Sequence, residues 1–250
     1  SMDPSNERVL LLIDGAYLEI NGLRPTTRLD KSEQGIKKLI LLLQEIIQKP
    51  FTDIFYVVAS HGNNNPNERN YHSNLHKNNI ETIVKNYKKM KSRCEKCEHI
   101  SARNVQAECD VSIATILLSR GYTNKYSTVA LLAGDGDFKD AVDIVRHELD
   151  KTVWVFGFRG SLSDKLRQKA SRNCSVDLED YWKYLYADDH MNVQAINTND
   201  HQATGTEIKE NLLILGYDTK AIDTALNLAK GDFSKVMNFL NYEMDMSDDS

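Results

Sequence analysis

Four aspartates lie at positions in the sequence where the functional residues of α/β proteins are commonly found. Asp14 directly follows a run of aliphatic residues, Asp110 opens an amphipathic stretch, and Asp135 and Asp137 lie in a glycine-containing segment after another apolar run. Ligands of open α/β sheets bind at the carboxyl ends of the strands, so we expect these carboxylates to meet at one edge of a sheet. Crowded carboxylates repel each other, and their pKa values rise unless a cation joins them.

Oxygen donors of this kind suit a hard divalent cation such as Mg²⁺ or Mn²⁺. Such an ion can activate water and stabilise an in-line displacement at phosphorus, which is the chemistry of metal-dependent nucleases. The sequence therefore predicts that Asp14, Asp110, Asp135 and Asp137 are both metal ligands and catalytic residues, with Asp140, one turn after Asp137, as a further ligand. Taken singly, Asp110 and Asp137 could instead cap helices, because aspartate is common at that position.

The elements that must position these acids follow from the apolar pattern of residues 1–187. Short apolar runs, typical of strands buried on both faces, alternate with stretches that carry apolar residues at helical spacing. Predicted strands cover residues 8–14, 53–59, 80–86, 127–133 and 152–156, and predicted helices cover residues 31–48, 67–78, 110–120, 137–149 and 162–170, with residues 176–186 closing the domain. This alternation predicts an α/β fold in which helices sandwich a parallel sheet.

Three segments resemble the acidic motifs of NYN domains, which belong to the PIN-like nuclease superfamily. They are Ile13-Asp14-Gly15-Ala16, Glu108-Cys109-Asp110-Val111-Ser112-Ile113-Ala114 and Gly134-Asp135-Gly136-Asp137-Phe138, and their order and spacing agree over roughly residues 7–175. The resemblance implies a PIN/NYN-like fold and a ribonuclease that depends on Mg²⁺ or Mn²⁺ and cuts RNA. It also assigns the metal-ligand roles to the four aspartates of these motifs.

Position 17 departs from the pattern that the resemblance sets. NYN domains usually carry an asparagine three residues after the first aspartate, and this chain has Tyr17 there. Tyrosine cannot supply the same carbonyl oxygen. The sequence therefore leaves an alternative open, in which the chain is a catalytically weak or inactive RNA-binding adaptor protein that uses the same groove.

Basic residues flank the acidic motifs in two places. The predicted RNA contacts are Lys85, Lys88, Lys89, Lys91 and Arg93 before the second motif, and Arg159 and Lys165 after the last strand. Cations beside an acidic cleft could neutralise the phosphates of a nucleic acid. A solvated strand end followed by a loop would give the same composition.

Cys94 and Cys97 form a CxxC pair, which is half of a structural zinc site. His72, His76 and Cys109 are candidates for the remaining ligands, so Zn²⁺ is a possible second metal. Four cysteines in 250 residues do not suggest a disulfide framework. Together with the lack of an apolar run long enough to span a bilayer, this favours a soluble intracellular protein, cytoplasmic or nuclear.

The pattern changes after residue 187. Residues 188–203 are polar and without periodicity, which is typical of a linker, residues 204–243 show three short helical patterns, and residues 244–250 form an acidic tail. Residues 188–250 hold twelve acidic residues and four lysines, a charge of −8, while the preceding part has 27 basic and 24 acidic residues, a charge of +3. A weakly basic body permits contact with nucleic acid but does not require it.

The segment 204–243 resembles a ubiquitin-associated (UBA) domain, a small three-helix bundle. Leu215-Gly216-Tyr217 is similar to the family's Met-Gly-Phe/Tyr loop, and Phe239-Leu240 is similar to the apolar end of its third helix. The resemblance implies that these residues dock on ubiquitin or a ubiquitinated protein. They could also only pack the small core, or bind a different partner, since an apolar patch marks an interaction site without naming the partner.

Overall fold

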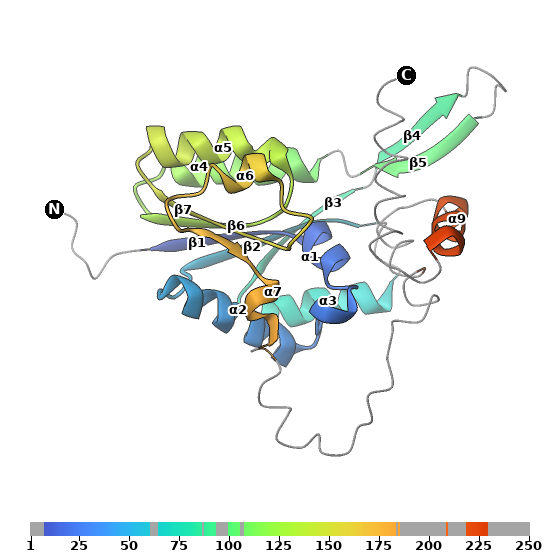
Figure 1. Ribbon diagram of the computed structural model, residues 1–250, viewed down its shortest axis with the longest axis horizontal. Coiled ribbons are helices and arrows are strands. Elements are labelled where there is room, and N and C mark those ends of the chain that lie inside the picture. Colours follow the sequence, from blue (N-terminus) through green and yellow to red (C-terminus); the bar gives the residue numbers. More distant parts are fainter. Residues whose placement is uncertain are drawn as a thin grey trace, which may run out of the picture.

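The computed structural model describes residues 8–60, 65–86, 88–93, 100–105, 108–183, 185, 209 and 219–229. Six parallel strands form one sheet in the order β3-β2-β1-β6-β7-β8 (Figure 1). They are β1 Val9–Asp14, β2 Asp53–Ser60, β3 Glu81–Asn86, β6 Thr128–Leu132, β7 Thr152–Gly157 and β8 Ser175–Asp177. The predicted α/β fold with a parallel sheet is therefore confirmed.

Helices cover both faces of the sheet. One face carries α4 Cys109–Gly121, α5 Lys139–Asp143 and α6 Asp164–Arg167, and the other carries α2 Glu33–Ile47, α3 Pro66–Lys77 and α7 Glu179–Trp182 (Figure 1). Successive residues of β1 point to opposite faces: Leu10 and Leu12 pack with the first group of helices, and Leu11 and Ile13 pack with the second. Both faces are apolar, which is why the central strand is an uninterrupted aliphatic run.

Shorter elements connect these layers at the edge where the parallel strands end. Helix α1 Gly15–Asn21 follows β1 without a break, and the 3₁₀ turns η2 Pro25–Thr27 and η3 Gly136–Phe138 lie before α2 and α5. The sequence did not predict α1, because seven residues are too few for a helical pattern to stand out.

Two predicted helices differ from the structure. The stretch predicted as one helix over 137–149 consists of η3, α5 and the π-helical turn η4 Ile144–Glu148, and the helix predicted over 162–170 is the four-residue α6. In the second case the chain must turn sharply toward β8, and the Ser171 amide bonds to Val153 of β7 instead of continuing a helix.

An antiparallel ribbon of two strands, β4 Lys88–Arg93 and β5 Ile100–Val105, lies between β3 and α4. It projects beyond the edge of the main sheet (Figure 1). The sequence predicted no strand here, because the segment is rich in basic and polar residues and lacks an apolar stripe. The basic residues Lys88, Lys89, Lys91 and Arg93 thus belong to a strand rather than to a loop.

One helix of the C-terminal region is described, α9 Thr219–Ala229. It covers the second of the three predicted helical patterns. The linker 188–203, the acidic tail 244–250 and the predicted contacts Leu215, Gly216, Tyr217, Phe239 and Leu240 lie outside the described residues, as do Cys94 and Cys97. Within the described part of the chain, no helix has the length and apolar character needed to cross a bilayer.

Candidate active site

Asp14 occupies the last position of β1 and is the N-cap of α1. Its Oδ1 accepts a hydrogen bond of 3.1 Å from the backbone N–H of Tyr17, and only 9% of the residue is exposed. Burial raises the pKa of the Asp14 carboxyl to about 7; the hydrogen bond from Tyr17 opposes the rise, and the charges of Asp110 and Asp135 add to it. At neutral pH a carboxyl with this pKa is about half protonated, whereas an ordinary aspartate is almost fully ionised.

The turn that carries Asp14 rests against Tyr56 of β2. A Cβ atom at Gly15 would lie 2.5 Å from the Tyr56 ring, so a side chain at this position would displace the turn. The Tyr56 hydroxyl donates to Glu19 Oε1 at 2.7 Å, and Lys31 Nζ donates to Glu19 Oε2 at 2.5 Å. These bonds fix the start of α1 against the sheet and thereby fix the direction in which Asp14 leaves β1.

Asp135 and Asp137 follow the neighbouring strand β6. The Asp135 carboxylate is the N-cap of η3 and accepts a hydrogen bond of 2.8 Å from the backbone N–H of Asp137. The chain is buried as far as Gly134, whereas Asp135 and Asp137 are exposed. The two carboxylates therefore stand at the rim of the sheet edge, with Asp14 behind them in the protein.

Asp110 lies in the first turn of α4. Ile113 and Leu117 are completely buried against the sheet and set the position of this helix. Asp110 is exposed as a residue, yet the protein around its carboxyl removes enough water to raise its pKa, and the charges of Asp135 and Asp137 raise it further. The structure thus brings the acids of all three motifs into one electrostatic cluster.

Two of the four acids are helix N-caps, but they are not the two that the sequence suggested. Asp110 and Asp137 are not N-caps, because the N-caps of α4 and α5 are Glu108 and Phe138. Asp14 and Asp135 are the residues that cap. Capping uses one carboxylate oxygen in each case, and a carboxylate has a second oxygen for another ligand.

The donor set fits a divalent cation in its chemistry. Carboxylate oxygens whose mutual repulsion raises their pKa are stabilised by a cation, and Mg²⁺ commonly binds through one or two carboxylates while it keeps several waters. Across the residues that the structure describes, no three Asp, Glu, His or Cys side chains stand close enough to enclose an ion directly. The carboxylates thus lie close enough to influence one another's pKa, but they do not form a direct three-ligand site.

Asp140 and Cys109, the further metal ligands that the sequence suggested, lie in different environments from the four acids. Asp140 is exposed and forms a 3.0 Å ion pair with Lys139, and its charge is not among those that raise the pKa of Asp110. Cys109 is buried, and burial together with the charges of Asp14 and Asp110 raises the pKa of its thiol to about 12. The Cys109 thiol would have to lose its proton on binding zinc, and its proposed partners Cys94 and Cys97 lie outside the described residues.

The predicted cationic contacts occupy different positions around the cluster. Lys85 is half-buried in β3, and its charge acts on Cys109, next to the second acidic motif. Lys165 is exposed on α6 beside the third motif, with its Cβ 3.9 Å from where a Cβ of Gly136 would lie. Arg159 instead pairs with Asp180 at 2.7 Å, so its guanidinium is already engaged.

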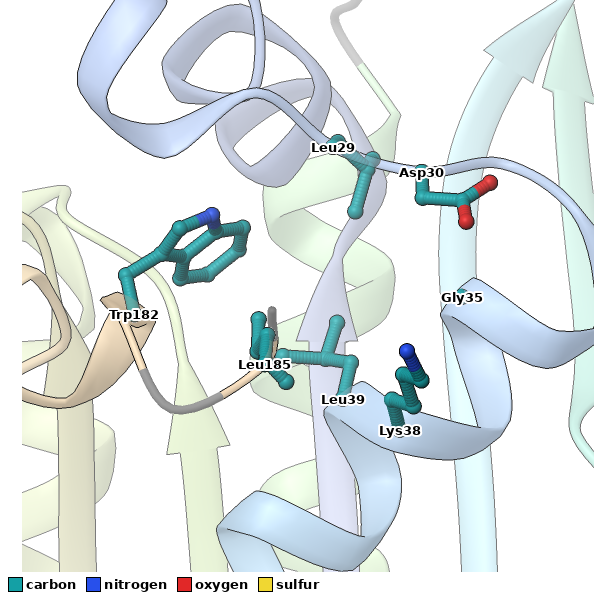
Figure 2. Close-up of a pocket in the computed structure, with 7 residues that line it drawn as sticks. All are labelled: Leu29, Asp30, Gly35, Lys38, Leu39, Trp182 and Leu185. Carbon is teal, nitrogen blue, oxygen red and sulfur yellow. The ribbon is translucent and has the colours of Figure 1, made fainter. Parts of the chain in front are cut away.

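A small pocket lies on the other flank of the domain, between α2 and α7 (Figure 2). It is lined by Leu29, Asp30, Gly35, Lys38, Leu39, Trp182 and Leu185. None of the predicted site residues is among them. The candidate site is therefore the acidic edge of the sheet, away from this pocket.

Sequence reasoning missed the residues that hold the acids in place. Tyr56 and Glu19 brace the first motif, and Asn21 and Ser161 form hydrogen bonds beside Tyr17. These residues are far apart in the sequence and belong to no motif. Their roles depend on contacts between β2, α1 and the chain after β7, for which the sequence contains no local signal.

A parallel sheet with three acidic motifs at its carboxyl edge defines a PIN-like nuclease fold. A family model for the NYN domain matches residues 8–179, and the chain belongs to this family, whose members are generally ribonucleases. The fold is also similar to the crystal structure of a protein of unknown function from Vibrio parahaemolyticus, with a TM-score of 0.52 and 19% identity over 72% of this chain and 98% of that chain. No curated protein matches the chain.

The raised pKa of Asp14 predicts how stability depends on pH. Between about pH 4 and pH 7 the folded protein keeps a proton that the unfolded chain has released, so the free energy of unfolding falls as the pH rises. Asp14→Asn retains a capping oxygen but lacks this titration. In metal-free protein we expect it to gain stability relative to the wild type over this range, by up to about 4 kcal/mol.

Urea denaturation at several pH values in the presence of EDTA measures this gain. The matched control is Asp143→Asn, since a hydrogen bond from Lys169 lowers the pKa of the Asp143 carboxyl and the control should show no such gain. If the difference in the free energy of unfolding between wild type and Asp14→Asn stayed constant from pH 4 to pH 7, the raised pKa of Asp14 would be contradicted.

Proposed function

We propose that this chain is an endoribonuclease that depends on Mg²⁺ or Mn²⁺ and carries a C-terminal module that binds ubiquitin. The observation that carries the nuclease proposal is the buried carboxyl of Asp14, whose pKa is raised by burial and by the charges of Asp110 and Asp135. These are the positions at which the chain resembles the acidic motifs of NYN domains. A buried carboxyl whose pKa is strongly perturbed beside other acids is typical of a functional site.

Asp14, Asp110, Asp135 and Asp137 would hold the cation. When bound, it supplies positive charge for a phosphodiester and lowers the pKa of water. The chain itself contributes orientation, because the backbone amides of Tyr17 and Asp137 fix one oxygen each of Asp14 and Asp135. Asp135 and Asp137 are exposed and accessible to a polymeric substrate, whereas Asp14 is buried.

RNA contacts would come from cations on both sides of the acids. Of the predicted cations, Lys85 on β3 acts on Cys109 of the second motif, and Lys165 on α6 lies beside Gly136 of the third. The ribbon strand β4 adds Lys88, Lys89, Lys91 and Arg93. Six strand residues extend about 20 Å, so the ribbon would bind nucleotides beyond the scissile phosphate. Arg159 would have to exchange Asp180 for a phosphate.

The alternative is an RNA-binding adaptor protein with little or no turnover. The observation that favours it is Tyr17, whose side chain takes the place of the usual asparagine. Both proposals use the same groove and the same cations, and they differ only in whether bound RNA is cut.

Cleavage of labelled single-stranded RNA by the full chain distinguishes the two proposals. With Mn²⁺ we expect endonucleolytic products that EDTA abolishes, and we expect Asp135→Asn to lower kcat about a hundredfold or more, since it removes one negative oxygen from the cation site. Asp143→Asn removes a carboxylate on α5 that pairs with Lys169 and should leave kcat unchanged.

A second arm of the same assay tests the cationic contacts. Lys165→Ala should raise KM and flatten the dependence of RNA affinity on salt, whereas Lys37→Ala removes the same charge from exposed α2 and should change neither. RNA binding without cleavage would support the adaptor and rule out the nuclease. Equal cleavage by the wild type and Asp135→Asn would show that the activity comes from elsewhere.

The ubiquitin proposal rests on the UBA-like segment 204–243, within which α9 occupies the second predicted helix and buries Ile222. Titration of the full chain into ¹⁵N-labelled ubiquitin should give saturable amide shifts of weak affinity, because the patch is small relative to standard interfaces. Leu215→Asp should abolish the shifts, and Lys37→Ala should retain them. Unchanged ubiquitin spectra at an excess of the chain would refute the proposal.

A further inference from the structure

Tyr17 touches the turns of two acidic motifs at once. Its backbone N–H donates to Asp14 Oδ1 at 3.1 Å. Its ring lies over Gly134, the residue directly before Asp135, so closely that a Cβ atom at Gly134 would be 2.1 Å from Tyr17 Cε2. One residue therefore contacts the end of β1 through its main chain and the end of β6 through its side chain.

The Tyr17 hydroxyl is part of a directed chain of hydrogen bonds. It accepts from the Phe158 backbone N–H at 2.8 Å and lies 2.9 Å from Ser161 Oγ. Burial raises the pKa of Tyr17 to about 12, so the hydroxyl keeps its proton and donates it to Ser161. Ser161 Oγ can then donate to Asn21 Oδ1 at 2.9 Å, and Asn21 Nδ2 donates back to the Tyr17 carbonyl at 2.8 Å.

The same chain segment holds Gly134 from its other side. The Ser161 carbonyl oxygen would be 2.4 Å from a Cβ atom at Gly134, and the Ser163 backbone N–H donates to the Gly134 carbonyl at 2.9 Å. Gly134 is thus confined between the Tyr17 ring and residues 161–163. A shift of either wall would move Gly134 and, with it, Asp135.

We propose that Tyr17 is a positioning residue that couples Asp14 to Asp135, and that the asparagine usual at this position is replaced here by a brace between the two turns. Its consequence for catalysis rests on the nuclease function proposed above. The hydroxyl holds residues 158–161, the ring holds Gly134, and the backbone amide holds the Asp14 carboxylate. Tyr17 touches no reacting atom and acts through the two aspartates.

Tyr17→Phe tests this coupling in the full chain, because it removes the hydroxyl and keeps the ring. The matched control is Tyr126→Phe, since Tyr126 is also shielded from solvent, with 1% exposed, and its hydroxyl bonds to Asp53, at the start of β2 and thus at the opposite edge of the sheet. We expect Tyr17→Phe to lower kcat about tenfold with little change in KM and to weaken Mn²⁺ binding severalfold. Ser161→Ala, which removes the acceptor of the same hydroxyl, should act in the same direction.

A readout independent of catalysis is the ¹H–¹⁵N spectrum of the metal-free protein. We expect the amide resonances of residues 134–137 to shift in Tyr17→Phe and to stay in place in Tyr126→Phe. If wild-type protein does not cut RNA, the nuclease proposal fails, and the spectra alone decide the coupling. The proposed coupling would be overturned if the amide resonances of residues 134–137 in Tyr17→Phe matched those of the wild type. In that case kcat and Mn²⁺ affinity, where they can be measured, would be retained, and only the melting temperature would fall.

Discussion

Burial of one carboxyl, that of Asp14 at the end of β1, is the constraint on which the candidate site depends. β1 is apolar on both faces, so the sheet and its helices bury the whole strand up to and including Asp14. Burial disfavours the ionised form of the carboxyl, and the acids of two other motifs add their negative charge. Ionised Asp14 is therefore disfavoured in the metal-free fold, and a nearby cation would relieve this cost.

The surrounding contacts keep this arrangement from relaxing. Gly15 lets the chain pass close to the Tyr56 ring, and Gly134 lets it pass close to the Tyr17 ring. Neither glycine has a positive φ. Their role is therefore to allow close approach of the chain, not to adopt an unusual backbone conformation. If the turns could spread, the carboxylates would separate and each would regain water. Tyr56 and Tyr17 contact these two turns and oppose such a movement.

The sequence predicted the parts of the fold that depend on local patterns. All five strands that it predicted are present, because aliphatic runs such as residues 9–13 are fully buried whatever their neighbours are. The NYN motifs were also evident, since each occupies consecutive residues. What escaped prediction depends on tertiary contact or on weak patterns: α1 is too short, and the ribbon β4–β5 has no apolar stripe.

The same distinction between local patterns and tertiary contacts applies to the candidate site. The acids themselves follow from strand ends and could be named from the sequence, but their unequal roles could not. Asp14 is buried and the other three are exposed, which follows from the depth of β1 in the sheet. Likewise, the sequence marked Tyr17 only as a departure from the family, while its ring, hydroxyl and amide each have a defined contact in the fold.

The most direct measurement of the central claim is the titration of the Asp14 side-chain carboxyl by ¹³C NMR, first with EDTA and then with Mg²⁺. We expect the Asp14 carboxyl to have a pKa near 7 in metal-free protein. Its pKa should fall by at least about one unit when Mg²⁺ is added, because an opposite charge nearby favours the ionised form. A carboxyl that titrates near its ordinary value without metal, or one whose pKa does not respond to Mg²⁺, would contradict it.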